Sequence, residues 1–409
     1  MIRTDQSPSR AIRTTPRRTV LISGASIAGP ALAFWLNRHG YAVTVVEKAS
    51  APRDGGYPVD VRGTALEVVR RMGILPRLRD AHIDLRRLTF LGEDGSEVVS
   101  VDPHTLTGGV AGEDLEVPRG ELTGALHAAV RDDVEFLFSD SIAALDQSGP
   151  GVDVTFRGGG SRTFDMVIGA DGLHSRTREL LFGPEERFHR YLGYCFAGFT
   201  MRNALGLSRE TVMWNTPGRA AALYAARDTG EGDDEVHAFL NFAQPEPPFG
   251  AFRDPRAQRD LVAAVFADAG WEVPGMLAAM RDADDLFFDV VSQIRMPRWS
   301  SGRVALVGDA AYAPSFLTGQ GSSLALVGAY MLASSLAGRD HTTGFAAYER
   351  RTRAFVTVNQ EQIGKGDAPL FPTTARGLER RNDMLLGLGT APRSAKGRPA
   401  HSALTLPAV

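Results

Sequence analysis

The order strand, glycine-containing turn, helix and second strand near the start of the chain constrains the fold more than any other feature. Residues 19–23 are an apolar run typical of a buried strand. Residues 27–39 have helical spacing and stop at Gly40, and residues 41–47 form a second apolar run. Strands joined through a helix pair in parallel with a right-handed crossover. The sequence therefore predicts an α/β fold built on a parallel sheet.

Later segments leave this pattern and return to it. Residues 164–169 and 303–308 are short apolar runs that end at glycine, as strands of the same sheet would. Between them, residues 192–242 have the turns and alternation of antiparallel strands, and residues 254–281 are predicted to be helical. We therefore expect an α/β domain, discontinuous in sequence, with an antiparallel second domain, α+β overall.

The expected boundaries follow from these segments and from composition. The two ends of the chain have few apolar residues, which favours disorder. The predicted parts are a disordered leader (1–18), a nucleotide-binding domain (19–80, 105–180 and 285–365), a substrate domain (81–104 and 181–284), a C-terminal helical segment (366–389) and a disordered tail (390–409).

Composition restricts the partners. The 409 residues are 43% hydrophobic and 23% charged, with a net charge of -3, so a folded soluble protein is expected without a field that attracts nucleic acid. A single cysteine, Cys195, indicates a reducing compartment, and we expect the cytoplasm. The apolar run after Arg17 and Arg18 resembles an export signal, but glycines and a proline interrupt it, so it is predicted to be strand and helix. No membrane span is predicted.

The first turn reads Gly-Ala-Ser-Ile-Ala-Gly at residues 24–29, a variant of GxGxxG with Ser26 at the middle glycine. Such a turn lets the backbone approach a pyrophosphate, while the helix start supplies N–H groups. Glu47 ends the next strand, where a carboxylate can bind ribose hydroxyls. The alternative is an ordinary strand–helix turn with a surface glutamate.

Two further strands end in glycine and aspartate. Asp171 follows one, ahead of a helix with two arginines; a plain turn before a surface helix is the alternative. Asp309 follows the other, where its carboxylate can accept a polyol hydroxyl. The glycines at 319–321 then begin a helix whose N–H groups can face an electron-rich ring. The alternative for Asp309 is a helix cap.

In this order and spacing, the three motifs resemble the FAD-dependent monooxygenases of the para-hydroxybenzoate hydroxylase type, which include tetracycline-inactivating enzymes. The resemblance spans about residues 19–365 and implies a Rossmann-like FAD-binding domain with an antiparallel substrate domain. It implies that the first turn binds the pyrophosphate, Glu47 the adenosine ribose and Asp309 the ribityl chain, with the turn at 319–321 behind the isoalloxazine ring. The residues implied for FAD are Gly24, Ser26, Ile27, Ala28, Gly29, Glu47, Lys48, Arg62, Arg119, Asp171, Asp309, Pro314, Gly319, Gln320 and Gly321.

Two positions depart from the family pattern. Ser26 stands in place of the middle glycine, and Pro314 opens a segment that is more glycine-rich in many relatives. The segment 55–63 matches the part of the family that passes near the ring, and Arg119 matches an arginine on the flavin side.

The resemblance also implies the reaction. NAD(P)H, docking transiently, would reduce FAD, and oxygen from O2 would reach an aromatic or polycyclic small molecule through a flavin C4a-hydroperoxide. No protein nucleophile or metal is needed, and no catalytic acid or base is assigned. The antiparallel layer supplies six candidate substrate contacts, each of which has the alternative of being core: Phe196, Phe199, Met213, Trp214, Tyr224 and Phe239. Phe316, in the segment that Pro314 opens, is a further candidate.

Other functions use the same motifs. A flavin halogenase needs a lysine beside its substrate. Lysines occur only at 48, 365 and 396, and none of these positions is expected in the substrate pocket, so that function is nearly excluded. A flavoprotein that uses FAD only to shape a cavity for a cyclisation, and a nucleotide-binding module without catalysis, both remain open. Oligomeric state is not predicted.

Overall fold

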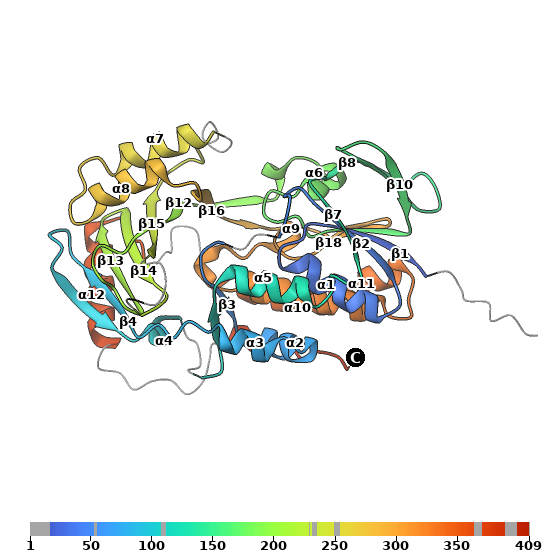
Figure 1. The fold of residues 1–409 in the computed structure, drawn as a ribbon, viewed down its shortest axis with the longest axis horizontal. Helices are drawn as coiled ribbons and strands as arrows, with labels where there is room; N and C mark the ends of the chain where they lie inside the picture. Colours follow the sequence, from blue (N-terminus) through green and yellow to red (C-terminus); the bar gives the residue numbers. More distant parts are fainter. Residues whose placement is uncertain are drawn as a thin grey trace, which may run out of the picture.

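The computed structural model describes residues 17–52, 55–107, 112–228, 230, 235–248, 254–363, 370–388 and 399–408. The leader predicted at 1–18 lies outside these ranges except for its last two residues. Two halves lie side by side, one around a parallel sheet and one around an antiparallel sheet (Figure 1).

The first half contains a six-stranded sheet in which β1 occupies a central position. β1 pairs in parallel with β2 on one side and β11 on the other, which confirms the predicted βαβ unit. In spatial order the strands are β17 (Ser300–Ser301), β18 (Val304–Leu306), β11 (Met166–Gly169), β1 (Thr19–Ser23), β2 (Ala42–Glu47) and β7 (Glu135–Phe138).

Both faces of this sheet are covered, which is why its strands are continuous apolar runs. Val20 and Ile22 pack in the large core with the helices, whereas Leu21 packs in a smaller core with a three-stranded sheet. That sheet consists of β8 (Ile142–Asp146), β9 (Val152–Phe156) and β10 (Ser161–Phe164), next to α6 (Arg176–Phe182).

The helical layer is centred on α10, which lies among other helices (Figure 1) and is buried along nearly its whole length. Its sequence is apolar around the whole circumference, as a central helix requires. The helices of this half are α1 (Ala28–Arg38), α2 (Thr64–Met72), α3 (Leu75–Asp80), α5 (Arg119–Ala128), α9 (Asp309–Tyr312), α10 (Gly321–Leu336) and α11 (His341–Gln360).

The second half is a seven-stranded sheet with helices on one face. Its strands are mostly antiparallel; β13 and β4 are parallel neighbours. In order they are β16 (Phe287–Ile294), β12 (His189–Arg202), β15 (Glu235–Ala243), β14 (Arg219–Ala225), β13 (Glu210–Thr216), β4 (Arg87–Leu91) and β5 (Glu97–Val101). The helices are α7 (Pro255–Val265) and α8 (Val273–Asp282), with α12 (Ala375–Leu388) beside β5.

The predicted boundary at residue 285 is placed too early. β16 begins at Phe287 and pairs antiparallel with β12, so it belongs to the second sheet. No strand is predicted from the sequence in this segment, and only the pairing with β12 shows which sheet it joins. The remaining division into domains stays a prediction.

Short elements complete the fold. β3 (Val59–Val61) and β6 (Leu115–Val117) form a two-stranded antiparallel sheet. The others are α4 (Pro103–Thr107) and the 3-10 turns η1 (Glu185–Arg187), η2 (Phe316–Thr318) and η3 (Pro399–Ser402).

Residues 399–408 are ordered against the first half, so the prediction that 390–409 is disordered is wrong for this part. Arg71 and Tyr330 both donate hydrogen bonds to the carbonyl oxygen of Pro407, each at 2.6 Å. The few apolar side chains of this segment pack against the large core, and burial of apolar surface offsets the entropy of ordering. Residues 389–398 and 409 lie outside the described ranges.

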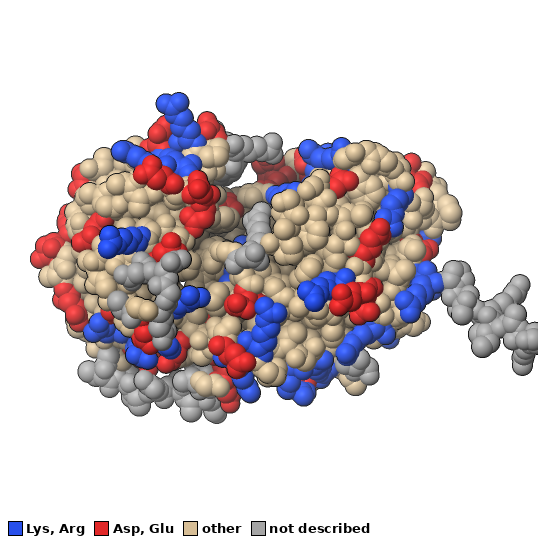
Figure 2. All heavy atoms as spheres, viewed as in Figure 1, with Lys and Arg blue, Asp and Glu red and all other residues tan. Residues whose placement is uncertain are grey.

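Acidic and basic side chains are interspersed over the face shown in Figure 2, in keeping with the small net charge. Among the helices of the described ranges, none has both the length and the hydropathy that crossing a membrane requires.

Candidate functional site: a cavity between the two sheets

A cavity of about 790 Å³ extends from the first turn of the parallel sheet to the aromatic face of the antiparallel sheet. Three predicted strand ends open into it, after β1, β11 and β18. Of the predicted residues, those that line it are Gly24, Ser26, Ile27, Ala28, Glu47, Lys48, Arg119, Asp171, Asp309, Pro314, Phe316, Gly319 and Gly321, together with Phe196.

The turn after β1 leaves no room for side chains. Gly24 has φ +107°, and a Cβ there would lie 2.5 Å from the carbonyl oxygen of Ala170. A Cβ on Gly29 would lie 1.9 Å from the carbonyl oxygen of Gly24, so Gly29 packs the helix onto the turn without lining the cavity. Ile27 precedes α1 and offers no side-chain cap, so the first N–H groups of α1 are left to a ligand.

Glu47 closes this turn as well as facing the cavity. Its carboxylate accepts hydrogen bonds from the backbone N–H of Ala25 at 2.8 Å and of Ala49 at 2.9 Å. Lys48 lies next to it on the wall, at the β2 end of the cavity. The other two lysines, at 365 and 396, lie outside the described residues.

Ser26 contacts a predicted site residue directly. The Nη2 atom of Arg119, the first residue of α5, donates a hydrogen bond to Ser26 Oγ at 3.0 Å. The residue that departs from GxGxxG thus positions a guanidinium on the cavity wall.

Asp309 is the first residue of α9, and its carboxyl faces the cavity from the floor. Burial raises the pKa of this carboxyl, while the positive charge of Arg119 opposes the rise. A ligand hydroxyl that donates a hydrogen bond to this carboxylate would stabilise its charged form, which loses contact with water in the cavity wall.

The turn before α10 also faces the cavity. Gly319 has φ +64°, and a Cβ there would lie 2.7 Å from Asp60 Oδ2. Ser315 has φ +81° without being glycine, an uncommon conformation at a site of this kind. Gln320 is fully buried, does not line the cavity, and its Oε1 has no partner among the described residues.

Asp171 has a structural role beside its place on the wall. Its carboxylate accepts hydrogen bonds from Ser175 Oγ at 2.5 Å and from the N–H and hydroxyl of Thr177, both at 2.9 Å. It therefore holds the start of α6, which is the alternative that the sequence left open.

His174, three residues further on, was not singled out in the sequence analysis. It bridges Glu185 at 2.8 Å and Asp289 at 3.2 Å, and these two carboxylates raise the pKa of its imidazole to about 10. Asp289 comes from β16, so the protonated histidine links the two sheets at the cavity wall. Only the fold brings His174 and Asp289 together, and no signal in the sequence marks this contact.

Arg62 does not line the cavity. Its guanidinium is buried and donates to Asp60 Oδ1 at 2.6 Å. Asp60 itself is on the wall; the sequence placed its segment near the ring but did not single it out.

An aromatic group forms the end of the cavity nearest the second sheet. Phe196 packs at 4.7 Å, between ring centroids, from Phe316, and at 5.8 Å from Tyr57. Phe287 completes the group on the wall. Phe239 stacks behind Phe196 at 5.6 Å without lining the cavity, and Met213 belongs to the same core cluster.

Phe199 and Trp214, predicted as substrate contacts, do not line the cavity. Both pack in the core beneath α7 and α8, on the other face of the sheet. Side chains alternate along a strand, so Phe199 faces away from Phe196, and Trp214 away from Met213. Tyr224 is buried and donates to Glu116 Oε1 at 2.9 Å instead of facing the cavity.

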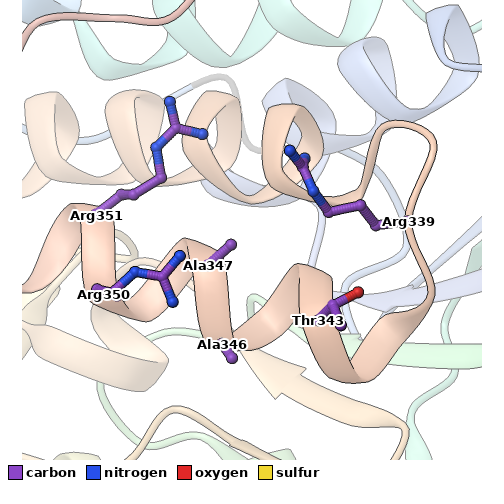
Figure 3. Close-up of a pocket in the computed structure, with 6 residues that line it drawn as sticks. All are labelled: Arg339, Thr343, Ala346, Ala347, Arg350 and Arg351. Atoms are coloured by element: carbon purple, nitrogen blue, oxygen red, sulfur yellow. The ribbon is translucent and has the colours of Figure 1, made fainter.

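A second hollow, of about 540 Å³, lies on the surface of α11 and the loop that precedes it (Figure 3). It shares no residue with the cavity. Its walls carry Arg339, Arg350 and Arg351 together with Thr343, and it contains none of the predicted site residues.

The cavity fits FAD on three counts. Gly24 keeps the backbone of the first turn open to one end of the cavity, an uncapped helix start and Arg119 offer donors for phosphates, and the partly buried Asp309 lies on the wall. The aromatic end offers apolar contact for planar rings. Ser292 lies on the wall, and its buried hydroxyl has no hydrogen-bond partner among the described residues.

Comparisons with known proteins agree with this site. The family described as FAD binding domain matches residues 17–361. An uncharacterized protein of Mycobacterium tuberculosis is 44% identical over 86% of this chain and 95% of its own length. A flavin-dependent monooxygenase from an unknown prokaryotic organism is 35% identical over 91% of this chain and 96% of its own. The crystal structure of the tetracycline destructase Tet(55) has a TM-score of 0.81 and 33% identity, covering 96% of this chain and 99% of that one.

The chain therefore belongs to the FAD-dependent monooxygenase family, which confirms the resemblance inferred from its motifs. FAD is its cofactor, and NAD(P)H is the reductant of this family.

Proposed function

We propose that this chain holds FAD along the cavity and inserts one oxygen atom from O2 into an aromatic or polycyclic small molecule, with NAD(P)H as the reductant. The observation that carries the proposal is the continuity of the cavity, which joins the three strand-end motifs to an aromatic wall of the second sheet. FAD supplies the redox chemistry, and the protein supplies binding, orientation and exclusion of water.

Under this proposal each group of residues along the cavity binds a different part of FAD. The turn at Gly24 and Ser26 takes the pyrophosphate, Glu47 the adenosine ribose, and Asp309 the ribityl hydroxyls. The turn at Gly319 lies behind the flavin ring. These positions are supported by the place of each residue along one cavity.

The substrate would bind against Phe196 and Phe316, with Tyr57 and Phe287 beside them. Phe316 is the more exposed of the first two, with 38% of its surface accessible, which suits a residue at the mouth of a site. We include a cytoplasmic location in the proposal, because the one cysteine, Cys195, is buried and unpaired.

The test is substrate-stimulated turnover. Purified protein, reconstituted with FAD, is mixed with NADH or NADPH and a panel of polycyclic phenols that includes tetracycline, since one structural relative is a tetracycline destructase. The expected result is faster NAD(P)H oxidation with oxygen uptake, and a product heavier by one oxygen atom in mass spectrometry.

Two outcomes would favour the alternatives. A yellow protein that converts a panel compound without consuming NAD(P)H or oxygen would be a non-redox flavoprotein. A protein that retains no flavin after reconstitution would be a nucleotide-binding module of another kind.

A further inference from the structure

Two carboxyl groups lie together on the small sheet of β3 and β6, at the ring end of the cavity. Asp60 and Glu116 are direct partners in the antiparallel register, so their side chains share one face. Asp60 lines the cavity and touches the Gly319 turn, whereas Glu116 lies behind it and does not line the cavity.

The two carboxyls have unequal partners. Asp60 accepts a hydrogen bond from the Arg62 guanidinium at 2.6 Å, and this arginine is buried. Glu116 accepts one from the neutral Tyr224 hydroxyl at 2.9 Å. A guanidinium stabilises a carboxylate more than a neutral hydroxyl does, so the negative charge belongs on Asp60 and the proton on Glu116.

The surroundings of Asp60 and Glu116 favour a state in which the two carboxyl groups share a single proton. Burial is the main cause that raises the pKa of Glu116 to about 7, and the charge of Asp60 adds to it. Burial also raises the pKa of Asp60, opposed by Arg62. The other titratable groups around the pair are Asp114 ahead of β6, Tyr224 with His237 behind it, and His82, whose Nδ1 contacts the main chain of Glu116.

We propose that Asp60 and Glu116 act as one unit that holds a single proton beside the cavity, with Glu116 as the residue that stores it. Glu116 is a positioning residue: its protonation sets the total negative charge beside the cavity, which is one charge, on Asp60, when Glu116 is protonated and two charges when it is not. Gain and loss of the proton make or break only the O–H bond of Glu116. This unit goes beyond the proposed function, because it exists in the protein without FAD or substrate.

Infrared difference spectroscopy on the FAD-free protein tests the unit directly. Between pH 6 and pH 8, the wild-type protein is expected to lose one carboxylic acid C=O band with a midpoint near 7. Glu116→Gln should remove this band, and Glu121→Gln, which changes an exposed carboxylate on α5, should not. An unchanged titrating band in Glu116→Gln, or no such band in the wild type, would overturn the proposal.

A second variant keeps the test decisive should Glu116→Gln not fold. The Tyr224 hydroxyl donates to Glu116 and so favours its ionised form, and Tyr224→Phe is expected to move the midpoint to higher pH. A midpoint that stays in place, or falls, contradicts the assignment of the proton to Glu116.

A binding measurement then follows the effect into the cavity. Above the midpoint the unit carries two negative charges, so the dissociation constant of FAD should rise with pH, by at most about tenfold per unit for one proton. In Glu116→Gln this dependence between pH 6 and pH 8 should flatten. A slope equal to that of the wild type would show that the pair is not coupled to the cavity, whereas failure of both proteins to bind FAD would count against the proposed function and leave the infrared result standing.

Discussion

Ser26 Oγ accepts a hydrogen bond from Arg119 Nη2 at 3.0 Å, across the first turn of the parallel sheet. Residues 26 and 119 are far apart in the sequence, and the turn and the start of α5 meet only in the folded chain. The serine therefore replaces the middle glycine of the fingerprint with a side chain that fixes a cation at the cavity wall.

The first prediction concerns this serine. Ser26→Gly restores the GxGxxG pattern but leaves Arg119 without its acceptor, and FAD should bind more weakly by about 0.5–1.5 kcal/mol, or two- to tenfold. Fluorescence titration of FAD measures this, with Ser26→Thr as the control that keeps the hydroxyl. Tighter binding in Ser26→Gly would mean that the close approach of backbone matters more than the arginine.

The second prediction concerns Asp309. Asp309→Ala removes an acceptor proposed for the ribityl hydroxyls, and FAD affinity should fall by about 1.5–3 kcal/mol, or roughly 10- to 150-fold. Asp309→Asn, which keeps the size and one acceptor oxygen, should lose less. If the alanine variant binds FAD with wild-type affinity, Asp309 does not bind the ribityl chain and serves only to begin α9.

The third prediction separates a side chain at the cavity, Phe316 of η2, from a side chain of the second sheet that lies in its core, Phe199. Phe316→Ala should raise the KM for an aromatic substrate while the melting temperature changes little, because Phe316 is partly exposed at the cavity. Phe199→Leu should lower the melting temperature and leave KM unchanged, since Phe199 is in the core under α7 and α8. Thermal unfolding and steady-state kinetics on both variants decide it; a KM effect in Phe199→Leu alone would contradict the assigned faces.

The fourth prediction concerns the bridge between His174, Glu185 and Asp289. The pKa of the His174 imidazole is about 10 in the folded protein, above its ordinary value of 6.5. The contribution of the bridge to stability is therefore complete below about pH 6.5 and is lost as pH rises through 10. The side chain is 51% exposed, so we expect only about 1 kcal/mol at pH 6.5. Urea unfolding of wild type and His174→Gln should show a difference that shrinks between pH 6.5 and 10; a constant difference would exclude this linkage.

The parallel half could be predicted from sequence because its signals are local. The strand at 19–23, the turn at Gly24 and the helix that follows are contiguous, and steric limits fix which residues the turn accepts. Asp309 and Gly319 likewise follow their strand within one short segment. The boundary of β16 was missed because only its pairing with β12 shows which sheet it joins.

The aromatic contacts could not be predicted in the same way. Phe196 and Phe199 are both apolar residues of one strand, and only the packing of α7 and α8 decides which face becomes core. Asp60, Glu116 and His174 each have partners from distant segments, so no periodicity marks them. The order of residues 399–408 depends on Arg71 and Tyr330, which lie far away in the chain.

The docking of Pro407 on α2 and α10 has a consequence for biosynthesis. The half that begins at Thr19 is completed only by later segments. Strands near residues 166 and 304 join its sheet, and residues after 400 pack on α2 and α10. Chains emerge from the ribosome amino end first. The nascent polypeptide must therefore carry an unfinished first half, with part of its apolar core uncovered, until those late residues have left the exit tunnel, and chaperones that shield such surfaces have that interval in which to act.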